Sequence, residues 1–212
     1  MRALLVICAL SGVARAAPGL DALVKAAPGC DAKRTHCLGL ALHVAIGDSG
    51  PIATADWVTA QITGANRHFE PLATEFKIVS IDALPASALR VEDRKERDSF
   101  ASLAKGRMIH VFVTGRLDDI DLPGNKIYGV AWRSRSNIKL IILSTQAFER
   151  TLAHELGHVF GLPHSAYPIS IMNKTEREDP PPEQRTFAPA ELVAMKPRLA
   201  WFVRAKALDD VR

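Results

Sequence analysis

One short stretch of the chain brings together residue types that bind a metal ion and move a proton. It contains His154, Glu155 and His158, followed by His164. Two histidines four residues apart on a helix lie on the same face, one turn apart, so both imidazoles can reach one ion. Glu155 projects near that ion without binding it. This placement predicts a general base that acts on a zinc-activated water.

A third ligand must come from beyond the helix. A catalytic zinc ion takes three protein ligands and keeps a fourth position open, and His164 is the predicted third ligand. Because His164 lies too far along the chain to share the helical face, the helix must end first. Gly161 permits a sharp turn because it can adopt a positive φ, and Pro163 prevents the helix from continuing. A chance match to all five fixed positions has a probability on the order of one in 10^5.

The full pattern HExxHxxGxxH, the serine that follows it and residues 170–173 (Ser-Ile-Met-Asn) resemble the metzincin zinc metalloproteases. The resemblance is greatest to their matrixin branch, and a pappalysin-like branch is the alternative. It implies a zinc metalloendopeptidase with Met172 as a hydrophobic floor beneath the ligands. It also implies a zincin fold of the α+β class. That fold has a mixed, twisted five-stranded sheet with an antiparallel edge strand, an active-site helix and a small C-terminal subdomain.

The chain departs from the matrixin pattern directly after the methionine. Asn173 and Lys174 stand where matrixins place the Pro and Tyr that shape the specificity pocket. We also find no pro-domain, no cysteine-switch motif and no histidine and aspartate set for a second zinc ion. The resemblance therefore leaves substrate preference and the control of latency open. It does predict that an extended protein or peptide substrate pairs with the edge strand, residues 126–132.

Hydrophobic periodicity supplies the elements that would position these residues. The expected strands cover residues 38–46, 76–81, 108–114, 126–132 and 139–143. The expected helices cover residues 54–69, 93–104 and about 144–160, and a last one begins near Pro189. Pro197 should kink or restart that last helix. This order of strands and helices independently favours an α+β domain.

The N-terminus resembles a cleavable signal peptide. Arg2 precedes an apolar run over residues 3–10, and Ala-Arg-Ala at residues 14–16 fits the cleavage rule. The run is too short for a membrane anchor. We therefore expect a secreted or periplasmic protein with a signal peptide (1–16), an irregular N-terminal strap (17–37) and a catalytic domain (38–212). Cys30 and Cys37 favour a disulfide, and a zinc-capping inhibitory cysteine is the rival interpretation.

Charge argues against nucleic acid as a partner. The chain has 27 basic and 23 acidic residues, and loss of residues 1–16 would leave 25 against 23, a net charge of +2. The basic residues are dispersed, whereas nucleic-acid binding needs a clustered basic surface. Composition does not predict the oligomeric state.

Two other groups of residues receive simpler interpretations. The acidic residues of the turn-rich loop at 118–125 could bind calcium, but their spacing lacks a full loop motif, which favours a solvated turn; they are Asp118, Asp119 and Asp121. The remaining histidines are interpreted as structural or exposed; they are His36, His43, His68 and His110.

Two functions compete with proteolysis. One is a non-catalytic, zinc-binding adhesion or binding protein, against which the presence of Glu155 argues. The other is a hydrolase of cell-wall peptides, which only substrate assays separate from a general endopeptidase.

Overall fold

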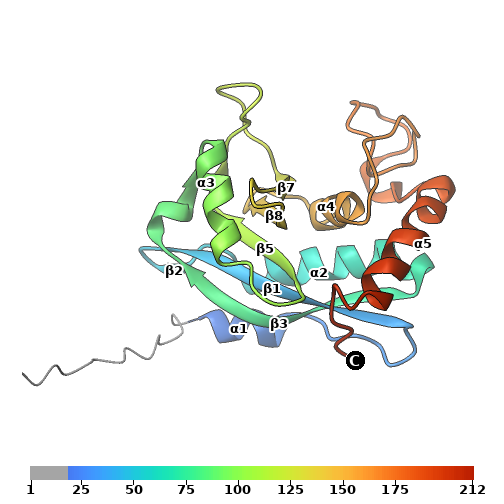
Figure 1. Ribbon diagram of the computed structural model, residues 1–212. Coiled ribbons are helices and arrows are strands. Elements are labelled where there is room, and N and C mark those ends of the chain that lie inside the picture. The colour runs from blue at the N-terminus through green and yellow to red at the C-terminus, as the bar shows by residue number, and fades with distance from the viewer. Residues whose placement is uncertain (1–18) are drawn as a thin grey trace, which may run out of the picture.

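A mixed five-stranded sheet forms the centre of the molecule (Figure 1). The computed structural model describes residues 19–212, so the expected signal peptide lies outside the described residues. The strand order is β3-β1-β5-β8-β7, and every neighbouring pair is parallel except β7 and β8. These strands are β1 (His36–Gly47), β3 (Thr74–Leu84), β5 (Ile109–Thr114), β7 (Gly129–Arg133) and β8 (Lys139–Ser144). The predicted α+β fold with an antiparallel edge strand is confirmed.

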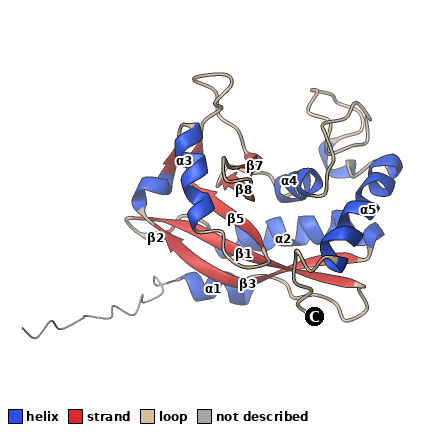
Figure 2. Cartoon of the chain, viewed as in Figure 1, coloured by secondary structure: helices blue, strands red, loops and turns tan. Residues whose placement is uncertain are grey.

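Helices cover both faces of this sheet, as Figures 1 and 2 show. The helices are α1 (Leu20–Ala26), α2 (Ala55–Phe69), α3 (Arg94–Ser99), α4 (Thr151–Val159) and α5 (Pro189–Arg204). Short 3-10 turns follow α2, β3 and α3 and precede α5, at Glu70–Leu72, Ala86–Leu89, Phe100–Ser102 and Pro182–Gln184. Short strands complete the fold: β2 (Gly50–Pro51) pairs with β1, and β4 (Arg90–Val91) pairs with β6 (Arg116–Leu117).

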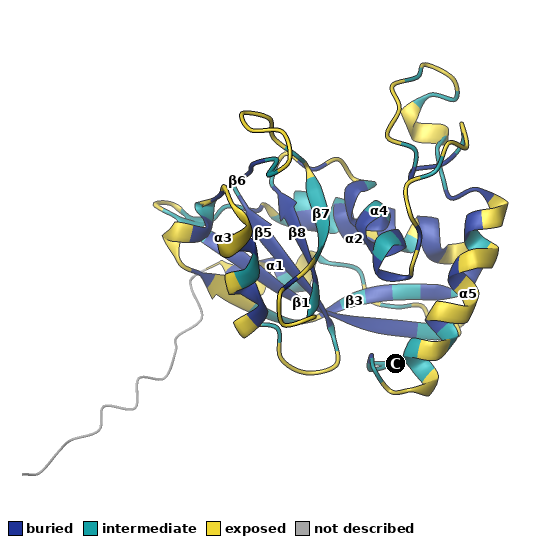
Figure 3. Cartoon of the chain, turned by 45° about the horizontal axis from the view of Figure 1, so that its top comes forward, coloured by how far each residue is buried: buried dark blue, intermediate teal, exposed yellow. Residues whose placement is uncertain are grey.

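The alternating direction of side chains along the strands produces two apolar cores, one on each face of the sheet. Successive side chains of a strand point to opposite faces of the sheet. In β8, Ile141 and Leu143 join the core that contains α1, α2, α4 and α5, whereas Leu140 and Ile142 join the core beneath α3. The central strands are therefore buried on both sides, in agreement with their continuous apolar sequences (Figure 3).

The structure corrects four expectations about the elements. The strap contains a helix, α1, because Leu20 and Leu23 recur at helical spacing and are buried against the large core. Helix α4 begins at Thr151 rather than near residue 144, because residues 145–150 form turns. The edge strand β7 begins at Gly129 rather than at residue 126. Helix α5 does not restart at Pro197 but continues through it.

A disulfide attaches the strap to the sheet. Cys30 and Cys37 are bonded, with their Cα atoms 6.0 Å apart, and Cys37 lies in the buried central strand β1. The interpretation favoured from the sequence is confirmed, and Cys37 is not free to cap a metal ion. Within residues 19–212, no helix is long and apolar enough to cross a lipid bilayer.

Candidate metal centre

The first turn of α4 is held in place by a side chain from α2. The buried amide of Gln61 donates to the carbonyl oxygens of Ala147 (3.2 Å) and Phe148 (2.8 Å). Its carbonyl oxygen accepts from the backbone N–H of Leu152 at 3.1 Å. One side chain therefore fixes both the turn before α4 and one of the free amides at the start of the helix. The sequence carries no signal for this role of Gln61.

Backbone carbonyls orient the first two histidines of α4. The Nδ1–H of His154 donates to the carbonyl oxygen of Ile171, and that of His158 donates to the carbonyl oxygen of Leu162, both at 2.7 Å. A carbonyl oxygen can only accept, so Nδ1 carries the proton in both rings and Nε2 carries a lone pair. Burial lowers the pKa of His154 to about 4, which keeps its ring neutral near neutral pH.

The three histidines of the motif converge on one point. The Nε2 atoms of His154 and His158 are 3.1 Å apart, and the ring of His164 lies 4.8 Å from that of His158, centroid to centroid. One nitrogen from each ring lies within 4.8 Å of the other two. Two lone pairs that face each other at 3.1 Å repel unless they share a cation. Two ligands of one tetrahedral zinc ion are separated by about 3.3 Å, so this donor set fits zinc.

Gly161 brings His164 back towards the helix. It adopts a φ of 100°, in the left-handed region, and its N–H donates to the carbonyl oxygen of His158 at 3.1 Å. The N–H of Leu162 donates to the carbonyl oxygen of Gly157 at 2.9 Å, so the last carbonyls of α4 are satisfied by the turn itself. The predicted break of the helix at Gly161 is therefore present.

Glu155 lies on the buried side of the site, next to the edge strand. Its side chain is buried, and burial raises its pKa to about 8. A hydrogen bond from the backbone amide of Ala131 acts in the opposite direction and lowers this pKa. Gly129 of β7 makes room for this carboxylate. A Cβ on Gly129 would lie 3.0 Å from Oε1 of Glu155 and 2.8 Å from methyl groups of Leu143 and Thr151. The sequence did not identify Gly129 as part of the site.

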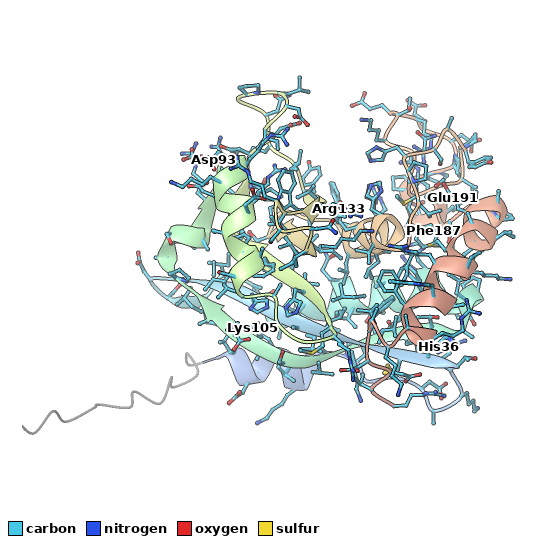
Figure 4. All side chains as sticks on the ribbon, viewed as in Figure 1. His36, Asp93, Lys105, Arg133, Phe187 and Glu191 are labelled. Carbon is cyan, nitrogen blue, oxygen red and sulfur yellow. A yellow bond between two sulfur atoms is a disulfide. The ribbon has the colours of Figure 1, made fainter. Side chains whose placement is uncertain are left out.

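Met172 packs directly beneath α4. It is fully buried, and a Cβ on Gly157 would lie 2.8 Å from its sulfur atom, so the helix can approach this closely only with glycine there. Phe187 lies beside the same glycine, between α4 and α5 (Figure 4). The predicted position of Met172 as an apolar floor agrees with this packing.

A buried carboxylate ties the methionine turn to α5. Ser170 donates to Glu191 at 2.7 Å, and the Ser170 oxygen accepts from the N–H of Met172 at 2.8 Å. Glu191 also accepts from the N–H of Ala188 at 2.7 Å, in the manner of a helix-capping residue. Figure 4 shows Glu191 near the start of α5. In the sequence, a glutamate at the third position of a helix that begins with Pro189 is the feature that could have indicated this capping role of Glu191.

The other histidines do not join this group. Within the described residues, no other cluster of three or more potential metal ligands is present. His43 and His110 contact each other at 3.0 Å on the opposite face of the sheet, and His68 contacts Thr186 at 3.2 Å. Their interpretation as structural residues agrees with these contacts.

The acidic loop gives no support to a calcium site. Arg90 and Arg116 bind the carboxylate of Asp118, and Arg94 binds that of Asp121 at 2.9 Å. The carboxylate of Asp119 accepts from two backbone amides of its own turn, at 2.9 and 3.2 Å. Both carboxylate oxygens of Asp118, and one oxygen each of Asp119 and Asp121, are therefore already used by arginines or by the backbone.

Comparison with known proteins places this geometry in context. The family model of the matrixins matches residues 63–187. Metalloproteinase-II from Bacteroides fragilis is 16% identical, with a TM-score of 0.52, and the match covers 83% of this chain and 60% of that one. Archaemetzincin from Methanopyrus kandleri is also 16% identical, with a TM-score of 0.53, over 80% of this chain and 99% of that one. At this identity the two structures show a shared fold. A comparison with curated protein sequences gave no match.

Proposed function

Since the chain belongs to the matrixin family, a family of zinc metallopeptidases, we propose that it is a zinc-dependent endopeptidase exported from the cytoplasm. In this proposal His154, His158 and His164 bind the catalytic zinc ion, and Glu155 is the general base. The observation that carries the proposal is the convergence of three imidazoles beside a buried carboxylate. When bound, zinc would supply a Lewis acid that acidifies a water molecule and polarises the scissile carbonyl.

The residues of the chain divide the remaining work. The carbonyl oxygens of Ile171 and Leu162 hold the first two rings with Nε2 towards the metal position, a contact that raises the basicity of a ligand. Glu155 accepts the proton of the attacking water and delivers it to the leaving amine. Its burial supports this role, because a carboxylate away from bulk solvent has an affinity for protons close to that needed near neutral pH.

The edge strand supplies the binding surface for an extended substrate. β7 pairs with β8 on one side and is the last strand of the described sheet on the other. Its outer backbone groups can therefore pair with a peptide. Gly129 of this strand lies against Glu155. A peptide that adds to β7 would thus run beside the proposed base.

Export is supported by two features. Residues 1–16 have the charge, the apolar run and the small residues of a cleavable signal peptide. The bond between Cys30 and Cys37 needs an oxidising compartment to persist. Mass spectrometry of the protein recovered outside the cytoplasm should show an N-terminus at Ala17; an intact Met1 in that fraction would contradict cleavage.

The decisive experiment is cleavage of unfolded casein by residues 17–212 loaded with zinc. We expect cleavage that is lost both on removal of the metal by a chelator and in the Glu155→Gln variant. The variant should retain one zinc ion per chain, because Glu155 is not a ligand. Full activity in Glu155→Gln would refute its role as the base. Bound zinc without cleavage of casein or of purified cell-wall peptides would favour the binding-protein alternative.

A further inference from the structure

A cavity of about 480 Å³ opens beside His154 and Glu155. Its walls come from the start of β7, the turn before α4, the first turn of α4 and the loop that follows Met172. This volume falls within the range of roughly 300–1,000 Å³ that is common for ligand sites. A substrate bound at the metal centre would therefore have room to place one of its side chains here.

The walls of this cavity carry an excess of positive charge. Three half-buried arginines line it, and together they define the arginine pocket: Arg150, Arg177 and Arg185. Within the described residues none of the three forms a salt bridge, unlike the neighbouring Arg67, which binds Glu149 at 2.7 Å. The exposed Lys174 also lines the cavity, and Glu176 is the one acidic residue of the walls besides Glu155.

Arg177 builds the wall rather than reaching into it. Its guanidinium donates to the backbone carbonyl oxygens of four residues, at distances of 2.7 to 2.9 Å: Pro168, Ser170, Asn173 and Thr175. These bonds fix the shape of the loop after the methionine turn. They neutralise none of the positive charge of Arg177, because a carbonyl group carries no net charge.

Arg150 and Arg185 keep donors available. Arg185 donates from Nε to the carbonyl oxygen of Pro180 (2.8 Å) and from Nη2 to that of Arg177 (2.6 Å). Its Nη1 group therefore has no partner among the described residues. Arg150 makes no side-chain hydrogen bond within residues 19–212 and lies over the ring of Phe148, 5.1 Å from its centroid. Both guanidiniums can thus bind an anion without breaking an existing bond.

The positive groups are close enough to disfavour one another. Burial, together with the charge of Arg185, lowers the pKa of both Arg150 and Arg177. The positive end of the α4 dipole lies at the same place, because the helix begins at Thr151. Repulsion between half-buried like charges is relieved when a carboxylate binds among them, and arginine binds carboxylates with two parallel hydrogen bonds.

We propose that the arginine pocket binds the carboxylate side chain of a substrate residue next to the scissile bond. The preferred substrates are proteins or peptides with glutamate or aspartate at that position. Arg150 and Arg185 determine this specificity, and Arg177 positions the loop that carries the pocket. This inference rests on the proposed function, because it assigns a substrate to the same metal centre.

The test uses zinc-loaded residues 17–212 and internally quenched peptides. A peptide mixture randomised at three positions on each side of the cleaved bond first locates the preferred residue. Matched peptides with Glu, Gln or Lys at that position are then compared by kcat/KM. We expect Glu to exceed Gln by about tenfold or more, because the neutral analogue cannot form a charge-assisted pair. Raising the ionic strength should reduce that ratio.

Variants connect the preference to individual residues. Arg150→Gln should bring the Glu-to-Gln ratio close to one, and Arg150→Glu should favour the Lys peptide. Arg204→Gln is the matched control, because it removes one positive charge from an exposed part of α5 and should leave the ratio unchanged. Zinc content and the midpoint of thermal unfolding verify that each variant is folded.

The outcomes separate this inference from the function on which it rests. Cleavage of casein with equal rates for the Glu and Gln wild-type peptides, or a preference for Lys, would overturn the inference and leave the endopeptidase intact. An unchanged ratio in Arg150→Gln would overturn the role of Arg150. No cleavage of casein or of any peptide would overturn the proposed function, and the inference with it.

Discussion

Replacement of Gly129 by alanine tests how closely the edge strand and the proposed base are fitted. The new Cβ would lie 3.0 Å from Oε1 of Glu155 and 2.8 Å from methyl groups of Leu143 and Thr151. Overpacking of this kind costs about 1–3 kcal/mol, against a gain of about 0.5–1 kcal/mol from replacing glycine in a strand. We expect a net loss of about 1 kcal/mol in the free energy of unfolding, or about 3 °C in Tm.

The effect on catalysis should be larger than the effect on stability. The new methyl group meets the carboxylate itself, and a displacement of a catalytic group by a fraction of an ångström lowers the rate by about 10–100-fold. We therefore expect kcat/KM on casein to fall by that factor in Gly129→Ala. Zinc content should stay at one ion per chain, because no histidine is touched.

The assay compares Gly129→Ala with Gly29→Ala at a temperature at which both are folded. A Cβ on Gly29 would meet nothing within 4 Å, so this control should match the wild type in rate and stability. Activity of Gly129→Ala within twofold of the wild type would refute the reasoning, because it would mean that Glu155 does not depend on the space left by the missing side chain of Gly129. Loss of zinc would also refute it, since the damage would then lie at the ligands.

Two further substitutions test the support of the site and its response to acid. Glu191→Gln should lower the free energy of unfolding in urea by about 2 kcal/mol, because the charge-assisted bonds from Ser170 and Ala188 are weakened; an unchanged midpoint would contradict this. Burial lowers the pKa of His68 from 6.5 to about 4. As the pH falls, the unfolded chain therefore takes up this proton first, and stability should decline between about pH 6.5 and pH 4, by up to about 3 kcal/mol from this residue. His68→Gln should show a shallower decline in unfolding experiments over that range, and an equally steep one would contradict the shift.

The convergence of these side chains could be predicted because it is local in the sequence. His154, Glu155 and His158 share one helix, and Gly161 and His164 follow within a single turn. Spacing alone therefore determines which side chains meet. The strands were recognisable for a similar reason, because those buried on both faces form continuous apolar runs.

The supporting residues could not be predicted because they act across the fold. Gln61 lies 91 residues from the amide of Leu152 that it accepts from. No periodicity in α2 distinguishes that glutamine from any other polar residue on a helix. The turn over residues 145–150, which delays the start of α4, also accepts two hydrogen bonds from this distant glutamine. The arginine pocket likewise joins residues from the start of α4 and from the loop after it.

The central position of β1 affects how this protein could be divided. β1 lies between β3 and β5, with hydrogen bonds to both, yet it precedes the first residue matched by the family model. A fragment cut at residues 63–187 would keep all three histidines and Glu155 but would lack the middle strand of its own sheet. It would also lose Gln61, and with it a hydrogen bond to the first turn of α4. The boundary at which relatives can be recognised is therefore not a boundary at which the chain can be cut, and any transplant of this centre must begin before His36.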